Sequence, residues 1–210
     1  MIEDLVRAIL KLSPGVKRIN ADLAFMRQLL KPMTDQIIPW ESEHELELLS
    51  LKHEIKSQKQ GLDKVLSGSL YSIYYEPMVV FAYKDYIKGS REALLCTRTR
   101  NNEFIFRIKK RDVDVYLNGN QVAVIDQNNV MISLRSKEVL ARIKPYSNDL
   151  LAVMIRNKDV GHLFDPSRPH SPQQRAFTLI QDLVEEEERI LLAVSLFELV
   201  TRLLSNKKSK

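Results

Sequence analysis

The sequence has few of the residues that mark well-known classes of protein. Its single cysteine, Cys96, excludes a disulfide framework and a zinc site built from cysteines. Its six glycines are scattered, and the patterns Gly-x-x-x-x-Gly-Lys, Gly-x-Gly-x-x-Gly and Gly-x-Ser-x-Gly do not occur. Enzymes that depend on those motifs are therefore excluded, whereas an active site assembled from dispersed residues is not.

Long apolar runs are also missing. The most apolar stretch, residues 190–204, includes Glu198 and Arg202 and is shorter than the roughly 20 apolar residues of a membrane-spanning helix. The N-terminus carries Glu3 and Asp4, where a secretory signal peptide has basic residues. We therefore expect a cytoplasmic protein with no transmembrane segment.

The sequence does contain enough apolar residues for a folded core. Of its 210 residues, 44% are hydrophobic and 28% are charged, which excludes a mainly disordered chain. A chain of this length buries a substantial core, either as one large domain or as a smaller domain with extensions.

The N-terminal third has helical periodicity. Apolar runs over residues 4–12 and 19–30 are followed by a capping box, in which Ser42 precedes Glu45 by three residues. Apolar side chains then recur at steps of three and four, at Leu48, Leu51, Ile55, Leu62 and Val65. We expect a helical arm over residues 1–66 whose last helix, 42–66, either packs on its own domain or mediates self-association as a short coiled coil.

From residue 67 the apolar period changes to two, with turn residues at short intervals. Short connections predict antiparallel pairing of successive strands. The expected strands are 70–76, 78–83, 93–99, 103–110, 113–117, 121–125, 130–134, 138–143 and 150–156. Asn118-Gly119 predicts a type I′ hairpin that pairs Val115 with Val122, and Asn101-Asn102 predicts a second turn that pairs Arg100 with Glu103.

A Pro-rich segment then leads into a final helix, expected over residues 172–204 and apolar on nearly every side beyond residue 189. The predicted fold class is α+β: an antiparallel β-meander, curved or closed into a small barrel, with N-terminal helices and a long, largely buried C-terminal helix. The β-domain is expected to span residues 67–210.

Positive charge is concentrated on one predicted hairpin. Residues 91–111 contain seven bases and two acids, which accounts for the whole net charge of +5. Alternation places Leu95, Thr97, Thr99, Phe104, Phe106 and Ile108 on a core-like face. The opposite face carries the candidate binding residues Arg98, Arg100, Arg107 and Lys109, together with Cys96, although cysteine usually prefers a buried position.

A second polar cluster follows the last predicted strand. Imidazole, carboxylate and guanidinium groups occur there within nine residues, at His162, Asp165, Arg168 and His170. These groups can perform acid–base chemistry near neutral pH, but the segment also contains three prolines and is typical of a connector. Glu41 and His44 have the i, i+3 spacing of a metal-binding pair without a second copy, so we expect neither a metal site nor a cofactor.

These observations favour a non-catalytic binding module. The basic hairpin face would bind an anionic ligand or an acidic protein partner, because clustered charges add their potentials; a solvated outer face is the alternative interpretation of the same bases. The alternative functions are an enzyme with a dispersed site near His162 and His170, and a nucleic-acid-associated protein that binds by charge alone. Phe104 and Phe106 point away from the basic face and cannot stack on bases there. No motif supports a membrane surface or nucleic acid as the partner.

Overall fold

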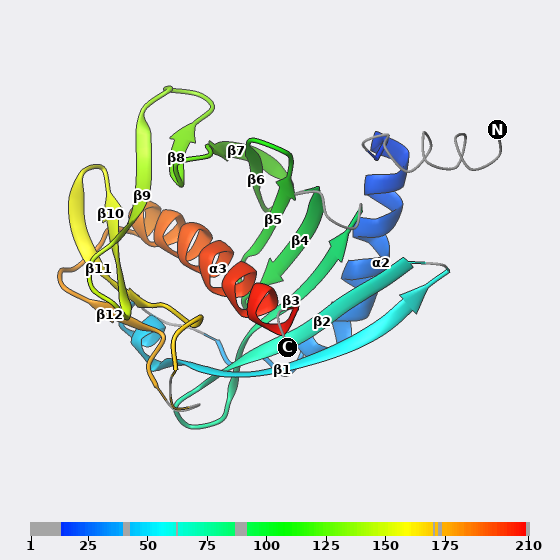
Figure 1. The fold of residues 1–210 in the computed structure, drawn as a ribbon, viewed down its shortest axis with the longest axis horizontal. Helices are drawn as coiled ribbons and strands as arrows, with labels where there is room; N and C mark the ends of the chain where they lie inside the picture. The colour runs from blue at the N-terminus through cyan, green and yellow to red at the C-terminus, as the bar shows by residue number, and fades with distance from the viewer. Residues whose placement is uncertain are drawn as a thin grey trace.

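The chain folds around a single antiparallel sheet of 12 strands, in which every strand pairs with the next one in sequence. The computed structural model describes residues 14–39, 43–61, 63–86, 92–169, 171 and 174–208. Figure 1 shows the sheet curving around one helix while another helix lies outside it. The elements are α2 (Val16–Thr34), the 3₁₀ helix η1 (Glu43–Leu48), β1 (Leu49–Gln60), β2 (Asp63–Ser72), β3 (Pro77–Asp85), β4 (Ala93–Arg98), β5 (Glu103–Ile108), β6 (Val113–Leu117), β7 (Asn120–Ile125), β8 (Val130–Ser133), β9 (Val139–Pro145), β10 (Leu150–Ile155), β11 (Lys158–Phe164), β12 (Phe177–Leu179) and α3 (Glu185–Lys208).

The two ends of the meander come together. The amide of Leu51 donates to the carbonyl oxygen of Gln174 at 2.9 Å, and the amide of Ala176 donates to that of Leu49 at 2.7 Å. The first strand therefore meets the segment just before the last strand. The sheet is a nearly closed barrel, and this decides between the two architectures that the sequence left open.

Helix α3 lies on the concave side of this sheet (Figure 1). Its apolar residues are at most 9% exposed on every side of the helix axis, and Phe197 contacts Phe106 of β5 with ring centroids 5.1 Å apart. The main core consists of this helix and the inward side chains of the strands. The expected buried C-terminal helix is confirmed. Within the described part of the chain, no helix combines the length and apolar character needed to cross a membrane.

Helix α2 covers part of the convex side and forms a second, smaller core. Met26 and Leu30 are fully buried there against β2, β3 and β4. Cys96 belongs to this core and is fully buried, because α2 covers the face on which it lies. The preference of cysteine for burial is thus satisfied on the outer face of the hairpin.

The prediction of a helix over residues 42–66 is wrong. Among the described residues of this range, only η1 is helical, and Leu49–Gln60 and the residues from Asp63 onward belong to β1 and β2. Gly61, which interrupts the apolar pattern, lies in the turn with a positive φ of 60°. Strand β2 faces the main core on one side and α2 on the other, so its apolar residues occur on both faces and hide the two-residue period.

This correction also changes the expected organisation of the chain. The boundary expected between residues 66 and 67 falls inside β2, and the predicted self-association helix does not exist as a helix. Among the described residues, one α-helix precedes the sheet, α2, and it contains the predicted run 19–30. The predicted helix over residues 4–12 lies outside the described residues.

The eight predicted strands between residues 78 and 156 correspond to β3–β10. The final helix begins at Glu185 and not at residue 172, because Phe177–Leu179 instead pairs with β11 as strand β12. Gly161 makes that pairing possible: a Cβ atom there would lie 2.4 Å from the carbonyl oxygen of Thr178 and 2.6 Å from the Phe177 ring.

The Asn118-Gly119 turn has the positive φ values of a type I′ hairpin, 48° and 87°, as predicted. A β-bulge between Val115 and Tyr116 then shifts the register by one residue, so Val115 pairs with Ala123 and not with Val122. Ala123 is consequently buried in the core, whereas Val122 is 37% exposed. The predicted pairing of Val115 with Val122 is therefore wrong.

We predict that Phe197→Ala lowers the free energy of unfolding by about 3–5 kcal/mol, because it leaves a cavity between α3 and β5. Val184→Ala is the matched control, since Val184 is 61% exposed, and it should change stability by no more than about 0.5 kcal/mol. Urea denaturation of both variants measures the difference. Equal effects would show that α3 does not contribute to the core.

Candidate anion-binding site

The hairpin of β4 and β5 has a longer loop than its sequence predicts. Arg98 pairs with Glu103, so the register differs by two residues from the expected pairing of Arg100 with Glu103. A shift of two preserves the face of every side chain, whereas a shift of one would exchange the faces. Phe104 and Phe106 therefore point into the main core, as predicted.

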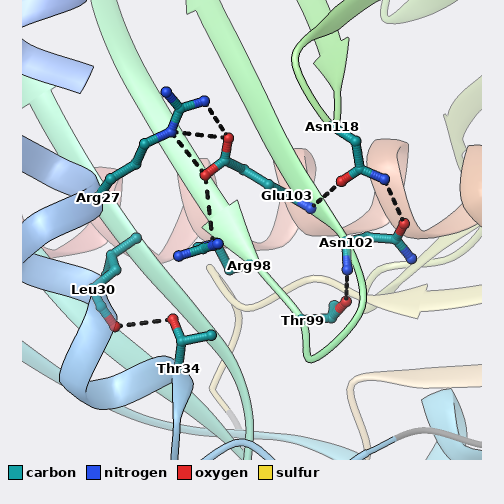
Figure 2. Close-up of polar contacts among 8 residues, drawn as sticks. All are labelled: Arg27, Leu30, Thr34, Arg98, Thr99, Asn102, Glu103 and Asn118. Carbon is teal, nitrogen blue, oxygen red and sulfur yellow. Dashed lines mark hydrogen bonds and ion pairs between the residues drawn. The ribbon is translucent and has the colours of Figure 1, made fainter. Parts of the chain in front are cut away.

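At the turn end of this hairpin, two arginines share one carboxylate. Glu103 accepts hydrogen bonds from Arg27 of α2, with Nε 3.1 Å from each carboxylate oxygen and Nη2 2.5 Å from Oε1 (Figure 2). Arg98 lies on its other side, with Nε 3.5 Å from Oε2. The hydrogen bond from Arg27 to Glu103 raises the pKa of the Arg27 guanidinium. Arg98 therefore already has a carboxylate partner.

Asparagine side chains hold Glu103 in this position. The amide of Glu103 donates to Oδ1 of Asn118 at 2.9 Å, and Nδ2 of Asn118 donates to Oδ1 of Asn102 at 3.2 Å (Figure 2). The amide of Asn102 in turn donates to Oγ1 of Thr99 at 3.1 Å. These bonds join the β4–β5 and β6–β7 turns, while Arg100 projects from the first turn and is exposed.

The other end of the hairpin carries a basic pocket, which we define as the cavity of about 390 Å³ beside the β5–β6 turn. Its lining includes four bases, Arg107, Lys109, Lys110 and Arg111, and two acids, Glu92 and Asp112. Lys109 forms an ion pair with Asp114 at 2.6 Å. Arg107, Lys110 and Arg111 have no ion pair with any described residue.

The four candidate residues on the outer face thus lie in two separate groups. Arg107 and Lys109 line the basic pocket, whereas Arg98 and Arg100 lie at the turn end of the hairpin. The sequence placed these residues on one face but could not show that α2 covers the region between them. Lys110 and Arg111 join the pocket because they lie in the β5–β6 turn.

A buried lysine, Lys84, lies between α2 and the sheet, close to the basic pocket. Nζ of Lys84 lies 2.8 Å from a carboxylate oxygen of Asp22 on α2, 2.8 Å from one of Asp63 on β2, and 3.1 Å from Oε1 of Gln60. The Lys84 side chain is 2% exposed. The hydrogen bond from Lys84 lowers the pKa of the Asp63 carboxyl below that of an ordinary aspartate. The residues of this lysine cluster attach α2 to the sheet.

Tyr86 connects the lysine cluster to the basic pocket. Its ring centroid lies 5.8 Å from Nζ of Lys84, and the residue also lines the pocket. Burial, followed by the negative charge of Asp22, raises the pKa of its hydroxyl well above the usual range. That hydroxyl is buried and has no hydrogen-bond partner among the described residues.

The buried thiol of Cys96 has a different character from a reactive cysteine. Burial raises its pKa to about 12, with a smaller contribution from the carboxylate of Glu103. A thiol with such a pKa is almost entirely protonated near neutral pH and is a poor nucleophile. Cys96 therefore has a packing role under α2.

The structure describes three of the four residues of the second predicted cluster, His162, Asp165 and Arg168. The carboxylate of Asp165 accepts a hydrogen bond from Nη1 of Arg202 at 2.8 Å, and Arg202 also pairs with Glu198 at 2.5 Å. His162 stacks on Tyr146, with ring centroids 4.1 Å apart, and its Nε2 atom has no hydrogen-bond partner among the described residues. Arg168 is exposed, and the predicted residue His170 lies outside the described residues.

The Arg202 contacts instead attach the last turns of α3 to the end of β11. The described residues contain no group of three potential metal ligands. Glu41 and the side chain of His44 lie outside the part of the chain that the structure describes. No protein-family model, curated protein or solved structure matches the chain.

We predict that Lys84→Met lowers the free energy of unfolding by about 3–5 kcal/mol, because the buried Asp22 carboxylate loses its counter-charge. The double variant Lys84→Met with Asp22→Leu should recover most of the loss, since neither charge then remains buried. Urea denaturation of the two single variants and the double variant measures the coupling.

Arg18→Gln provides the control, because it removes a base that pairs with the same Asp63 carboxylate at 3.0 Å but is half exposed. It should cost no more than about 1 kcal/mol. If Lys84→Met also lowered the free energy of unfolding by no more than about 1 kcal/mol, this would contradict the role assigned to the lysine cluster.

Proposed function

We propose that the protein is a non-catalytic binding module that recognises an anionic ligand, or an acidic segment of a protein partner, at the basic pocket. The observation that carries this proposal is the set of three bases in the pocket, Arg107, Lys110 and Arg111, that have no ion-pair partner among the described residues. Charges that converge on one cavity add their potentials and attract an anion.

The chemistry of these side chains favours a phosphate or carboxylate group. Arg107 and Arg111 each present a planar fork of N–H donors that matches two oxygens of such a group. Lys110 adds a mobile ammonium group. Because Lys109 is paired with Asp114, it contributes less to the field of the pocket than the other three bases.

The rigid position of the pocket also supports binding. The β5–β6 turn belongs to a hairpin whose inner face is packed on α3, and Tyr86 joins the pocket to the buried lysine cluster. Bases on a rigid element lose less conformational freedom on binding an anion. The buried, protonated thiol of Cys96 is compatible with the cytoplasmic location that forms part of this proposal.

The alternative functions receive less support. An enzyme with a dispersed site near His162 and His170 would have Asp165 as its nearby carboxylate, and that carboxylate already pairs with Arg202. Charge-driven association with nucleic acid would use the same bases, but Phe104 and Phe106 are buried in the core and offer no stacking surface. A membrane surface would meet the same bases without an additional feature that favours it.

We predict that the triple variant Arg107→Gln, Lys110→Gln, Arg111→Gln elutes from immobilised heparin at a lower salt concentration than the wild type. It should also abolish the changes that inorganic pyrophosphate produces in the amide NMR signals of residues 107–112. Binding of the wild type should weaken steeply with salt, because the pocket is open to solvent. Stability should change by no more than about 0.5 kcal/mol for each substitution.

The matched control is Arg100→Gln, Lys144→Gln, Lys158→Gln, which removes three exposed bases outside the pocket and gives the same net charge. This variant should retain pyrophosphate binding. Equal losses in both triple variants would show that the protein binds by overall charge, as a nucleic-acid-associated protein would. Loss in the control alone would place the site outside the basic pocket and contradict the proposal.

A further inference from the structure

A second cavity lies at the opposite side of β5 from the basic pocket. It has a volume of about 370 Å³ and opens between the first turns of α3 and the strands β5–β9. Its lining comes from both the barrel wall and the helix, including Phe104, Val115, Met131, Ile190 and Ala193. Pockets that hold small molecules have volumes of about 300–1,000 Å³ and mostly apolar walls, so this cavity is large enough for a small ligand.

The interior of this apolar cavity is well suited to a hydrocarbon. Phe104 and Val115 are fully buried, and Met131, Ile190 and Ala193 are at most 9% exposed, so their side chains form a continuous apolar wall. The strand that closes the wall, β8, has only four residues, and a bulge follows Met131. We attribute the unfilled space beside α3 to this short and irregular strand.

The rim of the cavity is charged. Arg135, Glu186 and Arg189 line it, and two of these three are already engaged. Glu186 pairs with Arg156 at 2.9 Å, and Arg189 pairs with Glu185. Arg135 projects from the β8–β9 turn, is exposed, and has no ion pair with any described residue. The charge at the rim that remains without a partner is therefore positive.

We propose that this cavity binds a small amphiphile whose apolar body lies against α3 and whose single anionic group pairs with Arg135. The apolar wall recognises the body, and a guanidinium group at the mouth recognises a carboxylate, sulfate or phosphate head. Phe104 and Arg107 point to opposite faces of β5, so this site is separate from the basic pocket. The proposal does not depend on the function proposed above.

Decanoate is the probe, and calorimetric titration of the full chain measures its affinity. Decan-1-ol and decyltrimethylammonium have the same chain with a neutral or a cationic head. Decanoate should bind at one site with the highest affinity of the three and should shift the methyl NMR signals of Val115, Leu117 and Met131. The absence of decanoate binding at 1 mM, about the weakest affinity worth measuring, would overturn the proposal. Tighter binding of the cationic probe would overturn the assignment of the head group to Arg135.

Two variants test the two halves of the site. Ala193→Leu fills the cavity from the helix and should weaken the binding of all three probes at least about tenfold. Arg135→Gln should weaken decanoate about tenfold while leaving decan-1-ol unchanged, because it removes only the charge-assisted bonds to the head. Lys137→Gln is the matched control: it removes an exposed base from the same turn outside the lining and should bind decanoate as the wild type does.

Binding that is unaffected by both Ala193→Leu and Arg135→Gln would place the amphiphile elsewhere and contradict the proposal. If Ala193→Leu fails to fold, the methyl signals of the wild type decide: shifts confined to the cavity support the site, and shifts elsewhere contradict it. The variants of the basic pocket should retain decanoate binding, so the two sites are tested independently.

Discussion

The structure depends on a helix that has no polar side over most of its length. Between Ile190 and Leu204, residues on every side of α3 are buried, so no single layer of protein could cover it. A meander of 12 strands solves this by curving until its first strand meets the segment before its last. Arg202 pairs with Glu198 on the same helix and with Asp165 after β11, and it thus attaches the last turns of the helix to the barrel. The barrel and the helix are therefore each required to bury the other's apolar surface.

Helix α2 forms a second layer, on the outer face of the sheet. Strands β2–β4 carry apolar residues on their outer face as well, and α2 covers them. Two ion-pair groups attach this helix: the buried lysine cluster around Lys84, and the pairing of Arg27 with Glu103. Arg27 of this helix thus pairs with Glu103 at the turn end of the β4–β5 hairpin, and the helix buries Cys96. Arg107, Lys110 and Arg111, in or beside the β5–β6 turn, have no ion pair with its described residues. The position of the proposed anion site is a consequence of where α2 docks.

Much of the sheet could be predicted from the sequence, because strands with one covered face show the two-residue period and end at recognisable turns. Strands β3–β10 were predictable for this reason. Strand β1 and the part of β2 before Leu70 were not, because β2 is covered on both faces and its apolar spacing matches a helical one as well. The candidate site was predictable in part: alternation gave the correct faces, but the two-residue shift that pairs Arg98 with Glu103 leaves no trace in that pattern. One feature of the sequence points to the lysine cluster: Lys84 directly follows an apolar strand segment. The acids that pair with Lys84, however, come from elements far apart in sequence.

The central claim is that α3 is the core of the barrel, and native-state hydrogen exchange of the full chain tests it most directly. The amides of Leu191–Leu204 should exchange only when the whole protein unfolds, with the free energy that urea denaturation gives and with the same protection as β4 and β5. Exchange of the α3 amides at a much lower free energy than those of β4 and β5 would contradict the claim, because the helix would then leave the barrel while the sheet stayed folded.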